Sequence, residues 1–526
     1  MVTTTIETNY WEMFTLKGED IEFLYNHLLE LETPLTSQEL VNALVEERIE
    51  RQKKIIEEQR TSGGDLYQPI KSYSLNQKLI FPALQWSHGE VIGIRPGENP
   101  DLADFQVIQV EFGNGIKREF AASVEDHILN QPPKITDESD QFDREAVLEQ
   151  YSDDLTDILE EDLATNPDFV RIAGRWFPRA ILVDTNVGHL NLAEAVLDEA
   201  GGGPLTTNTL LEQIELAPGV NPKLVEFSFD LALQEDTRFD EVGPAGDVLW
   251  FLRRLEPAEV LEPPVHLRYT PIEYDRSLIS GDMLDLEQML SDELSPVTAS
   301  YRHMDDGEIK LIYPHCRSGT LPLSARVRHL FPTAYEAPRI RFMLVDGDSG
   351  EEFPGWVVRE KRYVHGLAEW YQKHGVMPGS IIRLKKGSKP GQVIISTDSR
   401  RPSREWIRTV LVGSDSGIVF AMLKQVVSGT VDERMAIAIP DEEALDEVWL
   451  KNQKHQVPFE NLVLNTVREL AKLNPQSHVH ATELYAAVNV VRRSPPGPIL
   501  ALLASKSWFS HVGDLHFRLS EPESGN

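Results

Sequence analysis

The amino-acid sequence predicts an α+β protein that is divided into several domains. The chain has 526 residues, and a single hydrophobic core rarely grows beyond roughly 250–300 residues. Apolar residues recur at helical spacing in some segments and gather in short β-rich runs in others. A three-part phrase also occurs more than once: a helix-like stretch, a second helix after a polar break, and an ending of the form Phe-x-x-Val-Gly followed by aromatic-x-Leu.

The recurring phrase is clearest in the middle and at the end of the chain. The middle copy reads NLAEAVLDEA, GGGPLTTNTLLEQI and RFDEVGPAGDVLWFL, and the last copy reads LVLNTVRELAKL, HVHATELYAAV and WFSHVGDLHFRL. A partial copy, IEFLYNHLLELETPLTSQELVNALVEERI, opens the chain without the strand ending. A helix-turn-helix followed by a two-stranded wing can present a helix to a nucleic-acid groove. We therefore expect two to three winged-helix modules and, from the β-rich runs, two small β-barrel-like modules.

Residues 1–62 are expected to be helical and helix-turn-helix-like. Leu24 and Leu28 fall on one helical face. Pro34 breaks the run, and Thr36 offers an N-cap for the helix that follows.

Residues 63–132 show strand signals instead. The runs KLIFPAL, GEVIGIRP, FQVIQVEF and IKREFAA are separated by Gly, Pro and Asn, which predicts a small barrel. The pattern resembles Tudor- or SH3-like barrels, including the polymerase-binding module of CarD-type factors. The resemblance rests on Gly89-x-Val91, Phe105-x-Val107, Val110-x-Phe112 and Lys117-x-x-Phe120.

Residues 133–165 are dense in carboxylates and have few apolar anchors. Segments of that composition seldom bury enough apolar surface to fold. We therefore expect a mobile acidic linker here, with a short helix over part of it as the alternative.

Residues 166–297 and 446–526 are expected to be the two complete modules. They resemble the winged-helix family that includes the N-terminal domain of the bacterial RNA polymerase delta subunit and the related HARE-type helix-turn-helix. The resemblance implies the fold and a polymerase partner, and it transfers no DNA contact. It rests on Pro204-Leu205-Thr206, Leu210, Leu211, Phe239-x-x-Val242-Gly243 and Trp250-x-Leu252, and on His480-Ala481-Thr482, Leu484, Phe509-x-x-Val512-Gly513 and Phe517-x-Leu519.

Residues 298–445 form a basic β-rich segment. The stretch GWVVREKRYVHGLAEWYQKHGVMPGSIIRLKKGSKPGQVIIS resembles B3-type DNA-binding pseudobarrels in layout. The shared features are a strand with Trp, a short helix, and a Pro-Gly turn that returns to a strand. We expect Trp370 and Tyr371, on the amphipathic helix, to be core residues.

Charge is distributed unevenly along the chain. The formal net charge is −33; residues 1–300 carry about −36 and residues 301–526 about +3, whereas residues 311–430 carry about +8. A strongly negative field repels phosphate backbones. The acidic N-terminal part thus suits a basic protein surface, and the positive stretch is the expected place for nucleic-acid contact.

The candidate nucleic-acid-binding residues lie in that positive stretch and in the last module. Arg and Lys can neutralise phosphates, and an aromatic ring can stack on a base. For the basic β-rich segment, the alternative is that these residues form a solubilising surface. In the last module the helix around Thr482–Val490 could enter a groove, and the alternative there is a contact with a protein. The candidates are Arg359, Lys361, Arg362, Tyr363, Lys373, Arg383, Lys385, Lys386, Lys389, Arg400, Arg401, Arg404, Arg408, Arg492 and Arg493.

We expect no catalytic site, metal or cofactor. His303, His315, Cys316 and His329 match no compact zinc spacing, and the glycine run GGGP lacks the Lys-Ser/Thr of a phosphate loop. The single cysteine suits a reducing cytoplasm, and there is no apolar run of the length that a membrane helix needs.

The sequence thus predicts a non-enzymatic, cytoplasmic, transcription- or DNA-associated adaptor. Its basic C-terminal half would bind DNA, and its acidic N-terminal half would bind a protein such as RNA polymerase. Two alternatives stay open: a specificity or effector subunit of a DNA-modification or defence system, and a pure protein-interaction scaffold.

Overall fold

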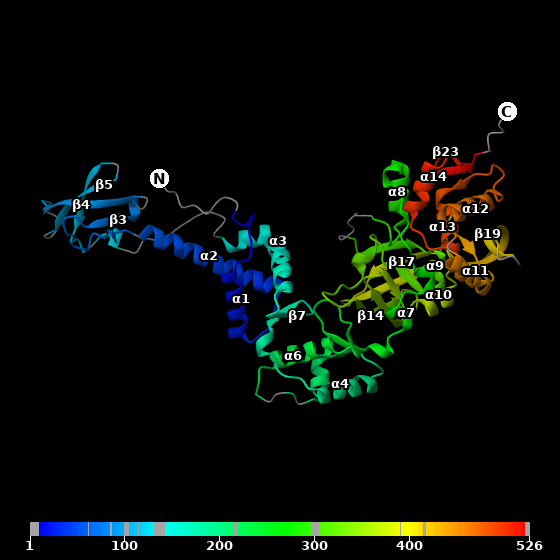
Figure 1. Cartoon of the computed structure of the whole chain (residues 1–526), viewed down its shortest axis with the longest axis horizontal. Coiled ribbons are helices and arrows are strands. Elements are labelled where there is room, and N and C mark those ends of the chain that lie inside the picture. The colour runs from blue at the N-terminus through cyan, green and yellow to red at the C-terminus, as the bar shows by residue number, and fades with distance from the viewer. Residues whose placement is uncertain are drawn as a thin grey trace. The chain divides into compact units, whose positions relative to one another are not determined.

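The protein is α+β, as predicted, and has several separate β-sheets (Figure 1). The structure is a computed structural model. It describes residues 10–520 except 62, 85–86, 99–104, 114, 126, 131–142, 215, 217–218, 297–303, 390, 414–416 and 456. The chain divides into two compact units: residues 1–171 with 175–182, and residues 172–174 with 183–526. No helix in the described part of the chain is long and apolar enough to cross a membrane.

Three helices and a three-stranded sheet form the first repeat, which we call module A (residues 18–61 and 144–178). The strand order is β1-β8-β7. Helix α2 has the predicted cap, because Thr36 N donates to Glu39 Oε2 at 2.8 Å and Glu39 N donates to Thr36 Oγ1 at 3.2 Å. The elements are α1 (Gly18–Leu31), β1 (Leu35–Thr36), α2 (Ser37–Thr61), α3 (Arg144–Thr165), β7 (Phe169–Ile172) and β8 (Arg175–Pro178).

Two predictions for this region were wrong. The first copy of the phrase does possess a strand ending, β7 and β8, but the inserted sheet separates it from α2 in the sequence. Residues 144–165 form helix α3 instead of a linker, while residues 131–142 lie outside the described residues. The buried residues Val147, Leu155, Leu159 and Leu163 recur at multiples of four and form one helical face. The density of carboxylates between them concealed this apolar stripe.

A five-stranded sheet is inserted between α2 and α3. Backbone bonds from Ser123 N to Lys71 O (3.1 Å) and from Val124 N to Pro69 O (2.8 Å) return the end of the last strand to the segment after the first. These bonds curl the sheet around a core that includes Phe81. The strands, in the order in which they pair, are β2 (Asp65–Leu66), β3 (Lys78–Phe81), β4 (Ser87–Pro96), β5 (Gln106–Phe112) and β6 (Lys117–Ala122).

Module B (residues 187–252) repeats the arrangement of module A, with strand order β10-β11-β9. Gly203 lies in the turn after helix α4 and has a φ of +112°. A Cβ at this position would lie 2.6 Å from the Trp250 carbonyl oxygen, so only glycine fits. Thr206 caps the second helix by accepting from Thr209 N at 3.2 Å. The elements are α4 (Val187–Glu199), β9 (Leu205–Thr206), α5 (Thr207–Leu211), α6 (Pro222–Glu235), β10 (Phe239–Glu241) and β11 (Leu249–Leu252).

A seven-stranded sheet follows, after the short helices α7 (Ala258–Leu261) and α8 (Gly281–Leu290). Strands β14 and β18 pair in parallel, and the other pairs are antiparallel. Helices α9 (Tyr313–Arg317) and α10 (Ala368–His374) accompany the sheet. Trp370 and Tyr371 are buried in its core, which confirms their predicted role. The strand order is β12 (Asp306–Lys310), β17 (Ile381–Lys386), β18 (Gln392–Thr397), β14 (Arg339–Asp346), β15 (Glu352–Val358), β16 (Tyr363–His365) and β13 (Thr320–Pro322).

A long hairpin connects the sheet to the last repeat. Its strands β19 (Ser399–Val412) and β20 (Ile418–Gly429) pair antiparallel, and β21 (Ile437–Ala438) joins β19. Val410 and Phe420 anchor one end of the hairpin in the core of the last repeat.

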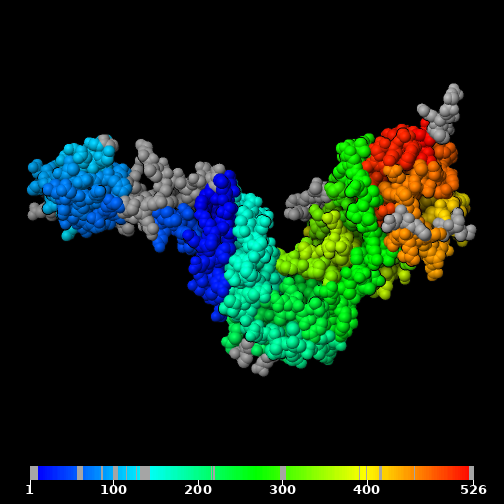
Figure 2. Space-filling model, in the orientation of Figure 1, coloured from blue at the N-terminus to red at the C-terminus, as the bar shows by residue number. Residues whose placement is uncertain are grey.

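Module C (residues 459–519) is the third repeat, with strand order β22-β24-β23. Its helix α14 packs against α8, and in Figure 2 the red C-terminal segment lies against the green residues near α8. Helix α11 (Glu442–His455) crosses the domain boundary predicted between residues 445 and 446, so that boundary was wrong. The elements are α12 (Phe459–Ala471), β22 (Val479–His480), α13 (Ala481–Val491), α14 (Pro496–Ser505), β23 (Phe509–Gly513) and β24 (His516–Leu519).

The register of the three small sheets aligns the modules residue by residue. In each module the two-residue strand pairs with the last strand through an apolar residue and an aromatic residue. The three pairs are Leu35 with Trp176, Leu205 with Trp250, and Val479 with Phe517. The hairpins also begin at equivalent phenylalanines, Phe169, Phe239 and Phe509.

This alignment superimposes three core positions, which we call the core trio. In module B the trio is Thr207, Asp230 and Trp250. The Trp250 indole Nε1 donates to Asp230 Oδ1 at 2.9 Å and to Thr207 Oγ1 at 3.1 Å. In module A, Trp176 Nε1 donates to Ser37 Oγ at 3.0 Å and Ser37 Oγ donates to Glu160 Oε1 at 2.6 Å. In module C the same positions hold buried Ala481, Leu500 and Phe517. The core trio is therefore polar and hydrogen-bonded in modules A and B, and wholly apolar in module C.

Candidate nucleic-acid interface

Three of the predicted contact residues are buried, Tyr363, Arg493 and, on strand β19, Arg408, which corrects their assignment. Tyr363 is 1% exposed, and its hydroxyl donates to the Glu259 carbonyl at 2.6 Å. Arg493 is also 1% exposed and is paired with Asp292 and Glu293. Neither side chain can reach a nucleic acid in this structure. Tyr363 and Arg493 both lie in basic stretches of sequence that are typical of a surface. They are buried because segments distant in the sequence pack against them.

Helices α13 and α14 of module C are buried, whereas a helix that enters a nucleic-acid groove must be exposed. Helix α13, which contains Thr482–Val490, is buried along nearly its whole length, and helix α14 is buried from Pro496 to Leu503. Arg492 donates to the Val457 carbonyl at 3.2 Å and lies over the Phe459 ring. Of the two alternatives left open for this helix, its burial therefore favours a protein contact over entry into a groove.

Cations on and near strand β17 are matched by carboxylates. Strand β12 runs beside β17 and carries acidic residues opposite the basic ones. Such pairing leaves little uncompensated charge for phosphates. The ion pairs are Arg383 with Asp398 and Glu308, Lys386 with Asp305, and Lys389 with Glu352, while Lys385 is the cross-strand neighbour of Asp306.

Four further candidates are held by local partners around strands β15 and β16 and helix α10. Their cationic groups donate hydrogen bonds to carbonyl oxygens or pair with carboxylates. The contacts are Arg359 to the Tyr335 and Ala337 carbonyls, Lys361 to Glu360, Arg362 to the Glu293 carbonyl, and Lys373 to Asp346 and Glu351.

The β19–β20 hairpin differs from these regions. Arg400 pairs with Glu405 at 2.7 Å, but no carboxylate of the described residues pairs with Arg401, Arg404 or Lys424. Antiparallel partners share a face of a sheet, and the cross-strand pairs here are Arg404 with Val426 and Trp406 with Lys424. We call the exposed face the hairpin patch: Arg404, Trp406, Met422, Lys424 and Val426.

Sequence reasoning missed the aromatic centre of this patch. Trp406 is 62% exposed, and Lys424 Nζ lies 5.5 Å from its ring centroid. The signal was available, because residues two apart on a strand share a face, which places Arg404 beside Trp406. Arg408, the next residue in that series, is instead buried: it pairs with Glu483 at 2.9 Å and donates to the Arg434 carbonyl.

No protein family, curated protein or solved structure matches this chain. The assignment of a function therefore rests on the geometry of the described residues.

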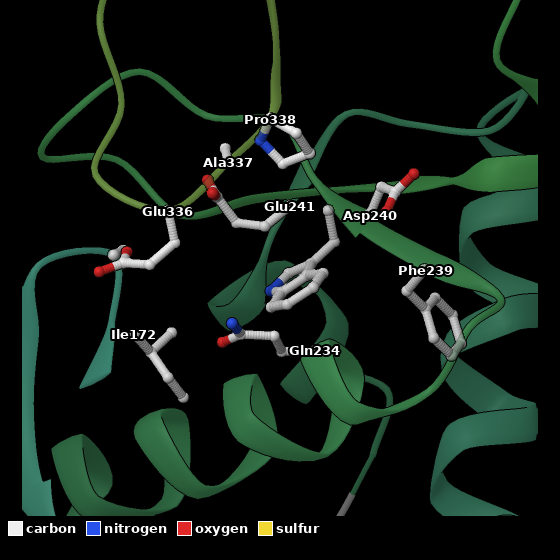
Figure 3. Close-up of a pocket in the computed structure, with 10 residues that line it drawn as sticks. Ile172, Gln234, Phe239, Asp240, Glu241, Glu336, Ala337 and Pro338 are labelled. Atoms are coloured by element: carbon white, nitrogen blue, oxygen red, sulfur yellow. The ribbon is translucent and has the colours of Figure 1, made fainter. Parts of the chain in front are cut away.

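A small pocket in the second unit gathers carboxyl groups (Figure 3). Glu241 and Glu336 lie on the same side of it in Figure 3. Glu241 Oε1 accepts from Gly243 N at 2.8 Å, and Glu336 Oε2 accepts from Gly174 N at 3.1 Å. Burial raises the pKa of Glu241 to about 8, and the charge of Glu336 adds to this effect. The residues that line the pocket include no serine, threonine, cysteine, lysine or histidine to act with these carboxyl groups, and we assign no reaction to it.

A cluster of Asp346, Asp348 and His374 has the spacing of a cation site. However, Lys373 Nζ already lies 3.0 Å from Asp346 Oδ2, and Ser349 Oγ donates to the same oxygen at 2.7 Å. The ammonium group supplies the positive charge that a cation would bring, so the cluster serves to hold α10 against the sheet.

Stability of module B should fall as pH rises from about 5 to 8. Burial raises the pKa of Asp230 to about 7, against the opposing hydrogen bonds from Thr207 and Trp250. The folded form therefore keeps a proton that the unfolded chain releases near pH 4, and the stabilisation is lost as pH rises through 7. Asp230→Asn, which retains the acceptor oxygen, should reduce the slope by up to ~1.4 kcal/mol per pH unit.

Urea unfolding at pH 5, 6.5 and 8 measures this slope. Asp236→Asn is the control, since Arg238 lowers the pKa of Asp236 and its titration lies below the window. An unchanged slope in Asp230→Asn would show that Asp230 is charged in the folded protein.

Proposed function

We propose that the chain is a non-enzymatic nucleic-acid-associated adaptor that contacts nucleic acid through the hairpin patch. The observation that carries the proposal is the local excess of unpaired cations. Arg401, Arg404 and Lys424 lack carboxylate partners among the described residues, in a chain whose net charge is −33. Most other predicted cations are neutralised by neighbours, so phosphate binding would concentrate at this hairpin.

The three repeats support a winged-helix interpretation. Each module orders its elements as helix, short strand, helix, helix and hairpin, with the hairpin's last strand in the middle of the sheet. The aligned core trio indicates that the modules are variants of one design. We infer that module C serves as an internal docking unit, because its helices α13 and α14 are buried.

Module A suits a protein partner rather than DNA. The exposed face of α3 carries Glu145, Glu149, Asp153, Asp157 and Glu161, each four residues after the last. A row of carboxylates repels a phosphate backbone and favours a basic protein surface. We propose that this half of the chain holds such a protein, and RNA polymerase remains the partner that the family resemblance implies.

Charge reversal tests the nucleic-acid contact. In the full chain, Arg404→Glu with Lys424→Glu should weaken binding of a fluorescein-labelled oligonucleotide more than tenfold at low salt. It should also reduce the slope of log K against log salt by about 1.4 to 1.8 if both residues contact phosphates. Fluorescence anisotropy at two salt concentrations measures both quantities.

The matched control is Lys386→Glu with Lys389→Glu, at the end of strand β17 in the seven-stranded sheet. Because these lysines already pair with Asp305 and Glu352, the effect should be severalfold smaller. Equal losses in the two double variants would contradict a localised site. No binding of single-stranded or duplex DNA or RNA by the unaltered chain would favour a pure scaffold.

A further inference from the structure

We propose that the hairpin patch is a stacking platform for unpaired bases, so that its ligand is a single-stranded nucleic acid. This inference rests on the proposed function and narrows it to one class of ligand. The platform consists of the Trp406 indole with Lys424 and Arg404 beside it on the same face of the hairpin.

The exposure of Trp406 is the first argument. Most large aromatic side chains of the second unit lie in its cores, whereas Trp406 is 62% exposed on a paired strand. Exposing so much of an indole forgoes much of the stabilisation that burial would give. Val426, the cross-strand partner of Arg404, is 60% exposed beside it. A contiguous exposed apolar patch bordered by cations is typical of a binding surface.

The arrangement of charge around the ring is the second argument. Lys424 Nζ lies 5.5 Å from the Trp406 ring centroid, and Arg404 lies two residues from Trp406 on the same face. Neither cation has a carboxylate partner among the described residues. A base stacked on the indole would bring its phosphates toward these cations, as in sites that combine stacking with a cationic groove.

The support beneath the platform is the third argument. The hairpin is held at one end by Val410 and Phe420 in the core of module C. In the middle of the hairpin Ile407, and toward the other end Val427, pack with Ala436, and beyond that end Thr430 N donates to the Asp398 carbonyl at 3.0 Å. A side chain on paired strands that are anchored at both ends is held in place before the ligand arrives.

The hairpin patch should prefer unpaired bases because the faces of bases in a duplex are already stacked on their neighbours. In a duplex both faces of each base are covered by neighbours, and exposing a face costs a few kcal/mol of stacking. A single strand offers base faces without that cost, and each stacked base contributes about 1–3 kcal/mol. The hairpin patch should therefore bind a single strand more tightly than a duplex of the same length.

Trp508 provides a matched control within the same chain. It is 39% exposed, and Lys506 Nζ lies 5.4 Å from its ring centroid. It thus reproduces the Trp–Lys pair of the hairpin patch. However, Lys506 pairs with Glu460 at 2.6 Å, so this second pair lacks the free cation.

Anisotropy titrations of the full chain test the proposal with labelled dT15, U15 and a 15-base-pair duplex. We expect the single strands to bind more tightly than the duplex. Trp406→Ala should weaken single-strand binding by about 5- to 150-fold and duplex binding much less, Trp406→Phe should retain part of the affinity, and Trp508→Ala should bind like the unaltered chain. Circular dichroism of each variant excludes unfolding as the cause.

The outcomes separate this inference from the proposed function. If duplex binds as tightly as single strand and Trp406→Ala changes neither, the stacking platform is overturned while charge-mediated binding stands. Equal losses in Trp406→Ala and Trp508→Ala would also overturn it. If no nucleic acid binds, both proposals fail, and the hairpin patch becomes a protein-docking surface.

Discussion

Replacing Arg493 with methionine should destabilise the second unit by about 3–5 kcal/mol, the largest effect that we expect from a single substitution. Its guanidinium donates to Asp292 Oδ1 and to Glu293 Oε1, each at 2.6 Å, with no exposed surface on the side chain. Removing one partner of a buried ion pair leaves the other charge without compensation. In this case two carboxylates would remain in an interior where Asp292 is also fully enclosed.

The position of this network explains why the effect should be large. The two acidic residues follow helix α8, whereas Arg493 follows helix α13 of module C. Tyr485 OH donates to Asp292 Oδ2 at 2.5 Å, and the His315 ring nitrogen Nε2 lies 3.2 Å from Glu293 Oε1. One arginine therefore joins module C to the segment that packs on the seven-stranded sheet.

Urea unfolding of the full chain, followed by tryptophan fluorescence, measures the loss. The neighbouring Arg492→Met is the control and should cost less than about 1 kcal/mol, because Arg492 is only part-buried. Adding Asp292→Asn and Glu293→Gln to Arg493→Met removes the stranded charges and should recover a large part of the stability. A loss below 1 kcal/mol in Arg493→Met would show that water or a rearranged partner solvates the pair.

Arg493 and Arg404 show which site features a sequence can predict. Both are basic residues in short polar stretches, and local composition predicts the same nucleic-acid contact for each. One lies at the centre of a network formed with residues about 200 positions earlier, and the other is exposed on a hairpin. Burial of this kind depends on packing between distant segments, which local composition and periodicity do not report.

The fold was predicted where the local signal was strong. The Phe-x-x-Val-Gly phrase located the hairpins of modules B and C, and Thr36 caps the helix that it was expected to cap. Only the first half of module A was predicted, because an inserted sheet separates its halves and because carboxylates surround the apolar stripe of α3.

The core trio yields the second large prediction. Trp250→Phe in module B should destabilise the module by about 2–3 kcal/mol, because it removes the indole N–H that donates to Asp230 and Thr207. Both polar groups are buried. The Thr207 hydroxyl still donates to Asp230, but the loss of the indole donor from this buried pair costs about 1–3 kcal/mol. The smaller ring adds a packing loss.

The apolar trio of module C supplies the compensating change. The triple variant Thr207→Ala, Asp230→Leu and Trp250→Phe reproduces Ala481, Leu500 and Phe517, and it leaves no polar group of the trio to satisfy. We expect it to lie within about 1 kcal/mol of the unaltered protein, since replacing both partners of a buried polar interaction can be nearly neutral. Hydrogen exchange of peptides from residues 187–252 measures the stability of this module directly. If the triple variant is as unstable as the sum of the single changes, the three positions act independently, and the alignment of the modules would not reflect a shared core design.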